Sequence, residues 1–353
     1  MFNSILGKLS SIIFIISFVY GTVSAQEITK EQVKSNGIKS IEKAVHAYSF
    51  GEPALVGKRI YEEMYDQNGN LISRSTYNEE GEIETKFDYD YDDHGNKISE
   101  TEYNSEGEIE TRTLMKYDAN RNVTEKTIYD SDQAIESKTL MEWNSQSQLT
   151  SETVYNDDGE IEKKKVVTYD DKNMLDKIII YDSDGEPVEK YGFKYNDDGF
   201  TQQEIKYNGE GEIENKKTME YDDDNNMILE NNYDSDGNLV SKSRLEYDAN
   251  SNLKERTDYD GDGDIQSNFI YQYDDHNNMT EEICQESNQM IYTNSYKYDE
   301  KGRLIEKIID NKDDDVYTKN IYQYNENDLI SEIIVHDKLD EPTSAIRYSY
   351  LYY

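Results

Sequence analysis

The sequence predicts an all-β protein, an antiparallel up-and-down meander of about two dozen strands built from 26-residue hairpin repeats, coiled or shell-like. Three observations predict it. Tyrosine recurs at alternating steps of 12 and 14 residues, a glycine, asparagine or aspartate often follows four residues later, and the apolar residues in between alternate with polar ones. A helical protein is excluded because the apolar period is 2 rather than 3.6.

The tyrosine frame begins at Tyr65 and continues to Tyr350, with a one-residue deletion before Tyr298. Other residues occupy the tyrosine position in a few repeats, namely Trp143, Gln285, Asp310 and His336. Self-similarity over so much of the chain indicates one repeat array rather than a set of unrelated domains.

Each repeat half ends in a hairpin turn. The pattern Asp/Asn-x-x-Gly, as in Asp66 to Gly69, fits a type I turn that ends in a left-handed bulge residue. Glycine and asparagine tolerate that conformation, and the first side chain can accept hydrogen bonds from the backbone of the turn.

The apolar positions lie six residues after each tyrosine and, in the longer halves, two residues before the next one. Both spacings are even, so the sequence predicts one strand face carrying tyrosine and aliphatic residues, and a polar opposite face. A sheet with one apolar face must coil, close into a shell or fold back on itself. A lipid-facing barrel is disfavoured because that face would also carry Lys163, Glu189 and Lys217.

Composition limits the partners. The chain has 37 Lys and Arg against 76 Asp and Glu, a net charge of −39, which disfavours nucleic acid and anionic membrane surfaces. Such acidity is typical of disorder, but 32 tyrosines favour a folded chain. Cys284 is the only cysteine, so the chain has no disulfide framework.

The first residues predict export. Residues 1–25 read as a signal peptide, with an apolar run from Leu9 to Tyr20 and small residues before a cleavage point after Ala25. We therefore expect a secreted, periplasmic or cell-envelope protein with no transmembrane segment after cleavage. Residues 26–60 are expected to form an N-terminal cap, in which Ile38 to Tyr48 is either a short helix or a degenerate first strand, and residues 61–353 form the β-repeat array.

The motif running from Tyr65 to Leu71, Tyr-Asp-Gln-Asn-Gly-Asn-Leu, resembles the YD repeats of Rhs and teneurin-like proteins, and a second copy begins at Tyr233. The resemblance implies strands that spiral into a shell, which encloses a toxin in some members, and an association with carbohydrate binding. The regular 12 and 14 spacing, with repeats continuing to Tyr350, is closer to a small secreted member without a toxin domain.

Catalytic chemistry is not expected. His94 and His276 occupy turn positions, His336 occupies a tyrosine position, and Cys284 takes the place of Ile128 in another repeat. No nucleophile, base and orienting residue occur as a set. We therefore predict that the protein is not an enzyme.

The acidic turns suggest a weak calcium site. Asp258, Asp260, Asp262 and Asp264 place carboxylates at alternate positions, and Gly263 allows a sharp turn. The twelfth position of the loop is Phe269 instead of the glutamate that an EF-hand uses, and strands flank the loop. The alternative is a hairpin turn that simply favours aspartate and glycine. Calcium is the only cofactor that the sequence suggests.

Two functions stay open. The first is a non-catalytic scaffold for interaction or adhesion at the cell surface or envelope, with an unknown protein or glycan as partner. The alternative is a carbohydrate-binding module, which needs aromatic residues outside the buried parity. The sequence offers Phe50, Tyr61 and Tyr292 for that role.

Overall fold

A computed structural model describes residues 28–49, 51–287, 289–312 and 315–353. The predicted signal peptide and Phe50 lie outside the described residues.

The described residues form one short helix followed by 25 strands. The elements are α1 (Lys30–Asn36), β1 (Ile38–Ser49), β2 (Glu52–Pro53), β3 (Lys58–Tyr65), β4 (Leu71–Tyr77), β5 (Ile83–Tyr91), β6 (Lys97–Tyr103), β7 (Ile109–Tyr117), β8 (Val123–Tyr129), β9 (Ile135–Trp143), β10 (Leu149–Tyr155), β11 (Ile161–Tyr169), β12 (Leu175–Tyr181), β13 (Pro187–Tyr195), β14 (Thr201–Asn208), β15 (Ile213–Tyr221), β16 (Met227–Tyr233), β17 (Leu239–Tyr247), β18 (Leu253–Asp260), β19 (Ile265–Tyr273), β20 (Met279–Glu286), β21 (Gln289–Tyr298), β22 (Leu304–Asn311), β23 (Val316–Tyr324), β24 (Ile330–His336) and β25 (Pro342–Tyr352).

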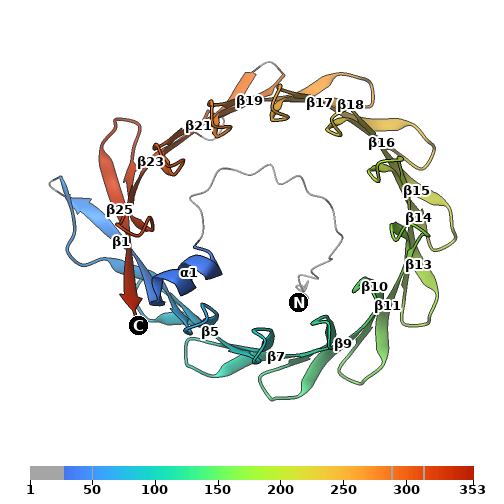
Figure 1. The fold of residues 1–353 in the computed structure, drawn as a ribbon, viewed down its shortest axis with the longest axis horizontal. Coiled ribbons are helices and arrows are strands. Elements are labelled where there is room, and N and C mark those ends of the chain that lie inside the picture. Colours follow the sequence, from blue (N-terminus) through green and yellow to red (C-terminus); the bar gives the residue numbers. More distant parts are fainter. Residues whose placement is uncertain (1–27, 50, 288, 313–314) are drawn as a thin grey trace, which may run out of the picture.

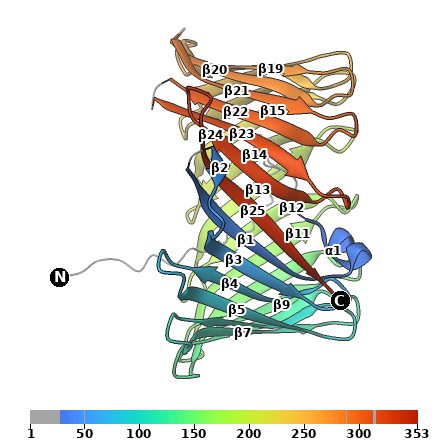
Figure 2. The ribbon, with the colours of Figure 1, turned by 90° about the vertical axis from the view of Figure 1, so that its left-hand side faces the viewer.

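The sheet is a closed antiparallel meander, which confirms the predicted fold class (Figures 1 and 2). From β3 to β25 each strand pairs with the next, and β1 pairs with β3 on one side and β25 on the other. The short β2 pairs with β1 alone, so the ring contains 24 strands. The backbone N–H of Tyr353 donates to the carbonyl of Gly37 at 3.0 Å beside this seam.

The wall is one sheet thick and encloses a space. A closed sheet of this many strands is too wide for its own side chains to fill. Most wall residues are half-exposed, as in β7 and β16, because neither face is covered by a second layer. Closure leaves no free sheet edge around the ring, which protects a meander of this length from edge-to-edge aggregation.

The turns have the predicted chemistry. In the turn after β7, the Asp118 carboxylate accepts hydrogen bonds from the backbone N–H groups of Asn120 and Asn122, at 2.8 and 2.9 Å. Arg121 takes the left-handed position with φ of 68°, where Gly69 has 77° in its own turn. The same bonds recur in most turns along both rims, so the recurring aspartate or asparagine is explained by turn geometry.

A β-bulge follows nearly every turn between the strands, in line with the predicted bulge residue, although the β22–β23 hairpin has no register shift. Its effect on the two faces of the sheet was not predicted. Tyr117 pairs with Val123, but the preceding Lys116 pairs with Glu125, so one residue of β8 has no partner on β7. The extra residue reverses the alternation of side chains relative to the neighbouring strand. As a result Tyr129, at the far end of β8, lies on the face opposite to Tyr117.

The expectation that every tyrosine of the frame shares one face is therefore wrong. Counting residues along the chain assumes that parity is preserved, but a bulge after a turn reverses it. The tyrosines form two groups on opposite faces. Those before one rim are Tyr65, Tyr91, Tyr117, Tyr169, Tyr195, Tyr221, Tyr247, Tyr273, Tyr298, Tyr324 and Tyr350, and those before the other are Tyr77, Tyr103, Tyr129, Tyr155, Tyr181, Tyr207, Tyr233 and Tyr259.

The helix shows which face is internal. Val33 of α1 is buried against Ile41, Tyr65 and Leu329, and Figure 1 shows α1 on the inner side of the ring. We call the group that contains Tyr65 the inner tyrosines and the group that contains Tyr77 the outer tyrosines. The helix forms through a capping box at Thr29, and the stretch after it is strand β1 rather than a helix.

The inner tyrosines and Trp143 complete the backbone hydrogen bonding of the wall. Backbone pairing between β16 and β17 stops at Leu229 and Arg244. Beyond that point the Tyr247 hydroxyl donates to the carbonyl of Met227 at 2.9 Å. Equivalent bonds recur from Tyr91 to Tyr350, each reaching a carbonyl on the preceding strand. A side-chain donor thus replaces the backbone donor where the two strands separate.

Candidate functional site

The outer face carries a row of tyrosines paired with cations. The residue directly across from each outer tyrosine is a lysine or arginine through most of the ring, and we call this row the outer tyrosine–cation row. Its pairs are Lys86–Tyr103, Arg112–Tyr129, Lys138–Tyr155, Lys164–Tyr181, Lys190–Tyr207, Lys216–Tyr233 and Lys242–Tyr259. The sequence contains this signal as a lysine or arginine at a fixed distance before each outer tyrosine from Tyr103 to Tyr259, and it was not among the predicted features.

In part of the row, at Lys86, Lys190, Lys216 and Lys242, the ammonium group lies over the face of the cross-strand tyrosine ring. The ammonium nitrogen of Lys216 lies 4.3 Å from the centroid of the Tyr233 ring, and that of Lys190 lies 5.2 Å from the Tyr207 ring. Such contacts contribute roughly 0.5–1 kcal/mol at exposed sites. They also fix the direction of otherwise mobile lysine side chains.

Two hollows adjoin this row. A pocket of about 330 Å³ is lined by Ile83, Lys86, Tyr103 and the turn that contains Gly107. A larger hollow of about 750 Å³ lies where β16 and β17 separate.

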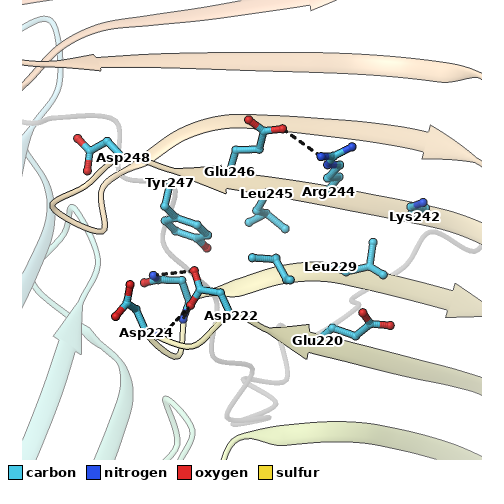
Figure 3. A pocket seen from close by; sticks show the side chains of 12 residues that line it. Glu220, Asp222, Asp224, Leu229, Lys242, Arg244, Leu245, Glu246, Tyr247 and Asp248 are labelled. Atoms are coloured by element: carbon cyan, nitrogen blue, oxygen red, sulfur yellow. Dashed lines mark hydrogen bonds and ion pairs between the residues drawn. The ribbon is translucent and has the colours of Figure 1, made fainter.

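Figure 3 shows the larger hollow, with Lys242 and Arg244 on one strand and Leu229 on the other. Arg244 is 3.3 Å from Glu246, and Tyr247 closes the floor between the strands. The hollow therefore presents both signs of charge and an aromatic ring at one place on the wall.

The inner face carries charged residues between its aromatic residues. Glu282 is 7% exposed, and its carboxylate accepts hydrogen bonds from the Tyr292 hydroxyl at 2.9 Å and the Asn294 amide at 3.0 Å. Burial lowers the pKa of the nearby Lys307 ammonium, and the charge of Glu282 opposes that shift. This is a packed polar cluster in the wall.

A second inner cluster lies beside α1. Glu63 is buried, accepts a hydrogen bond from Tyr65 at 2.6 Å and forms an ion pair with Arg74. Burial first, and then the Glu63 carboxylate, raise the pKa of the Tyr65 hydroxyl. Burial also raises the pKa of Tyr91 to about 12. These hydroxyls stay protonated at neutral pH and act as donors.

Tyr61 and Tyr292, proposed as aromatic residues outside the buried parity, both lie on the inner face, across from Lys43 and Cys284 respectively. The residues that satisfy that requirement are the outer tyrosines, because the bulges place them on the other face.

The aspartates of the proposed calcium turn have different partners and lie partly in the strand and partly in the turn. Asp258 lies within β18 and accepts from Arg256 Nε at 2.7 Å. Asp260 accepts from the backbone N–H groups of Asp262 and Asp264, and from the side chain of Gln266. Among the described residues, no group of three or more histidine, cysteine, aspartate or glutamate side chains is arranged to hold a metal ion. The calcium site stays a prediction.

The histidines and the cysteine lie in positions with structural contacts. His46 is 8% exposed, with Nδ1 at 2.8 Å from the carbonyl oxygen of Ala54 and its ring against Gly57. The backbone N–H groups of His94 and His276 donate to turn aspartates, Asp92 and Asp274. Cys284 is 3% exposed, and burial raises the pKa of its thiol.

In the part of the chain described, no helix is long and apolar enough to span a membrane.

A family model described as an uncharacterised protein matches residues 21–178, less than half of the chain. None of the curated proteins matches the chain. Among solved structures, the fold is similar to part of the Tc holotoxin pore of Photorhabdus luminescens, with 12% identity and a TM-score of 0.42 over 81% of this chain and 19% of that one. A porin-like protein from Bacteroides uniformis has 10% identity and a TM-score of 0.23, over 89% of this chain and 98% of that one. The chain thus spans 19% of the toxin chain, and similarities this low identify neither activity nor partner.

Proposed function

We propose that the protein is an exported, non-catalytic scaffold of the YD-repeat type, which interacts with other molecules at the cell surface or in the cell envelope. The observation that supports this most directly is the ring of hydrogen bonds from inner aromatic side chains to backbone carbonyls. The recurring residues of each repeat form the turns and complete the hydrogen bonding between neighbouring strands. A rigid wall with repeated surface features suits binding better than chemistry.

The placement of the reactive side chains supports a non-catalytic role. His46 and Cys284 are buried, and the other two histidines named above lie in turns. An enzyme would need a nucleophile or base oriented toward a shared reaction centre. The closed ring supplies repeated, equivalent wall surfaces instead.

Export is tested by expressing the full chain in a bacterial host and recovering the secreted and periplasmic fractions. We expect the mature chain to begin at Gln26. Mass spectrometry that finds the Met1 to Ala25 segment still attached in those fractions, or the protein only in the cytoplasm, contradicts export.

Carbohydrate binding is the second candidate, and the outer tyrosines favour it. Tyr103 is half-exposed on the outer face and lines a hollow. Aromatic rings with one free edge and nearby polar groups suit sugar recognition. On a glycan array, we expect the protein to bind a glycan and Tyr103→Leu to weaken that binding. The control is Tyr117→Leu on the inner face, which should leave binding unchanged. Circular dichroism checks that both variants are folded. The same loss in both variants contradicts recognition by the outer face.

A further inference from the structure

We propose that the loop of residues 54–57, which we call the seam loop, docks into the smaller hollow of a second copy of this chain, so that two copies exchange loops across their outer walls. The inference goes beyond the proposed scaffold function and depends on neither export nor carbohydrate binding. Its basis is a loop that the structure holds in place while its two apolar side chains lie in solvent.

The seam loop lies outside the repeat frame. It leads from β2 into β3, next to the seam where β1 pairs with β25. Leu55 is 97% exposed and Val56 is 87% exposed, the two highest exposures among the large apolar residues described. Adjacent aliphatic side chains that are held away from the core are typical of a surface that binds another molecule.

Contacts at both ends fix the seam loop. The backbone N–H of Ala54 donates to the carbonyl of Ala47 at 2.8 Å. The carbonyl of Ala54 accepts from Nδ1 of the buried His46, also at 2.8 Å. A Cβ atom at Gly57 would lie 2.5 Å from Nε2 of His46, so the imidazole ring packs directly on the Gly57 backbone. One histidine thus anchors both ends of the loop and leaves the two apolar side chains outside.

The seam loop lies on the outer side of the wall. His46, which it covers, shares a face of β1 with Ala44, and Ala44 pairs with Arg59. The Arg59 guanidinium lies 4.8 Å from the centroid of the ring of Tyr77, which is an outer tyrosine. Figure 1 shows the blue hairpin at the end of β1 projecting outward from the ring. The loop can therefore contact another molecule from the side of the ring.

The smaller hollow lies on the same outer wall and has room for both side chains. Ile83 and Tyr103 supply its apolar surface, and both are on the outer face, because Ile83 pairs with Tyr77 and Tyr103 with Lys86. Its volume is about 330 Å³. At roughly 30 Å³ for each group the size of a water molecule, the leucine and valine side chains together need about 200 Å³.

The charges beside the two surfaces are opposite. Lys58 directly follows the seam loop and is exposed, whereas Glu106 lines the hollow and Glu108 follows it in the same turn, both exposed. At physiological ionic strength the Debye length is about 8 Å, so these neighbouring charges act on the contact more strongly than the distant part of the net charge of −39 does. The local charges favour docking of the loop at this hollow.

The loop and the hollow of one chain suit a symmetric pair. The loop precedes β3 and the hollow lies at β5 and β6, so two to three strand spacings, roughly 10–15 Å, separate them. A two-fold axis normal to the wall between them places each loop at the hollow of the other copy. The acidic turn after β4 lies near that axis and opposes association. We therefore expect a reversible dimer with a dissociation constant of roughly 1–100 µM rather than a permanent one.

A lipid surface is the other class of partner that exposed leucine and valine side chains could contact. The turns beside the loop are acidic, with Glu79 and Glu80 after β4 and Asp337 after β24, and they would face the headgroups. Two aliphatic side chains alone also bury little area in a bilayer. The charge and the size of the loop favour the second copy.

Sedimentation velocity and light scattering of the mature chain, from about 1 to 200 µM at an ionic strength of about 0.15 M, measure the association. We expect Leu55→Ser with Val56→Ser to weaken the dimer at least about tenfold. The matched control is Val188→Ser with Val240→Ser, which removes two exposed apolar side chains from β13 and β17 and should leave the dimer unchanged. Circular dichroism checks that all variants are folded.

Gly57→Ala separates the presence of the apolar side chains from their placement. The added methyl group displaces the seam loop from the imidazole ring, while both apolar side chains remain. We expect this variant to weaken the dimer as well. A dimer as strong as that of the unchanged protein would contradict docking by a fixed loop.

Disulfide crosslinking tests the docking site itself. Cys284 is buried, so introduced cysteines react selectively. A tagged chain with Val56→Cys, mixed with an untagged chain with Ser105→Cys in the turn that lines the hollow, should give a mixed dimer on mild oxidation. Ser235→Cys is the matched control, because Ser235 has the same turn position in another repeat.

A monomer at all concentrations, equal loss in the two double-serine variants, or equal crosslinking of the two engineered turns overturns the proposal. Flotation of a monomer with phosphatidylcholine vesicles, lost in the Leu55→Ser, Val56→Ser variant, would also overturn it and assign the loop to a lipid surface. None of these results changes the outcome of the export test or of the glycan array, so failure of this inference and failure of the proposed function are distinguishable.

Discussion

The indole N–H of Trp143 donates a hydrogen bond to the carbonyl oxygen of Val123 at 2.7 Å, where the other repeats use a tyrosine hydroxyl. One repeat earlier, the Tyr117 hydroxyl donates to the backbone carbonyl oxygen of Lys97 at the same distance. Tyrosine and tryptophan share little in shape, but both carry a donor at the far end of a rigid ring. The repeat therefore requires an aromatic donor at this position.

Loss of one such donor should destabilise the wall. Tyr221 donates to the carbonyl of Thr201 at 2.8 Å. We expect Tyr221→Phe to lower the free energy of unfolding by about 1–2 kcal/mol, because the carbonyl loses its partner where strands separate. Urea unfolding followed by circular dichroism measures the change. Tyr233→Phe is the matched outer control and should change the free energy by less than about 0.5 kcal/mol; equal effects contradict this role of the hydroxyl.

Acid should weaken the turns. Hydrogen bonds from the Asn122 side chain and backbone lower the pKa of the Asp118 carboxyl, and Asn252 does the same for Asp248. A lowered native pKa stabilises the fold above the unfolded value of about 3.9, and this stabilisation is lost as the pH falls through the native pKa. We expect the melting temperature to fall below about pH 4.

Asparagine already begins the turns at Asn104 and Asn144, so it fits this position without a titrating group. Aspartate-to-asparagine changes at Asp118 and Asp248 should therefore reduce the acid-induced drop in melting temperature. A drop as steep as that of the unchanged protein would show that other groups control acid unfolding.

Glycine should improve a turn that now strains a longer side chain. Gln133 has φ of 64° in the turn after β8, where many other turns have glycine. We expect Gln133→Gly to raise the free energy of unfolding by about 1 kcal/mol, because glycine adopts this conformation without a Cβ clash. Asp132→Gly, one residue earlier and without a positive φ, should destabilise instead. Thermal melts of both variants measure the change in stability. A lower melting temperature in both variants would contradict the expected relief of backbone strain at Gln133.

A disulfide should cross the seam that closes the ring. Ala44 of β1 lies directly opposite Arg347 of β25. Facing residues of antiparallel strands have Cα atoms about 4.5–5.5 Å apart, a distance that a disulfide spans. Ala44→Cys with Arg347→Cys should form an intramolecular bond on mild oxidation and raise the melting temperature, since it closes a very long loop. Arg347→Cys alone is the control, and crosslinks found only between molecules contradict the closed ring.

The calcium hypothesis predicts a modest, low-affinity effect at the turn from Asp258 to Asp264. Asp260 already accepts three hydrogen bonds, so an ion would have to displace some of them. The hypothesis expects calcium to raise the melting temperature more than sodium chloride does at equal ionic strength, and Asp262→Asn to remove the difference. Equal effects of the two salts mean that only screening occurs.

Much of this architecture follows from the chain alone. The step from Tyr65 to Tyr77 and the turn chemistry of residues such as Asp66 and Gly69 define strand length, hairpin order and the meander. These are local properties, because a turn is built from residues a few positions apart and strand alternation from their neighbours. The same frame identified Trp143 as a substitute for tyrosine.

Which face of the wall each tyrosine occupies could not be predicted from these local patterns. Whether Tyr129 shares a face with Tyr117 depends on a bulge in the hydrogen-bond ladder between two strands, and residue spacing along one strand does not record it. The outer tyrosine–cation row, and with it the candidate binding surface, therefore became visible only in the paired sheet.

The sequence by itself determined the repeat, the strands and their turns, since each depends on residues close together in the chain. Only the tertiary structure decided that β1 joins β25 to close the ring, that α1 lies inside it, and which side chains line the interior. The physical reason is that closure depends on the accumulated twist and stagger of all the strands, so the pairing of the first strand with the last is a property of the whole sheet.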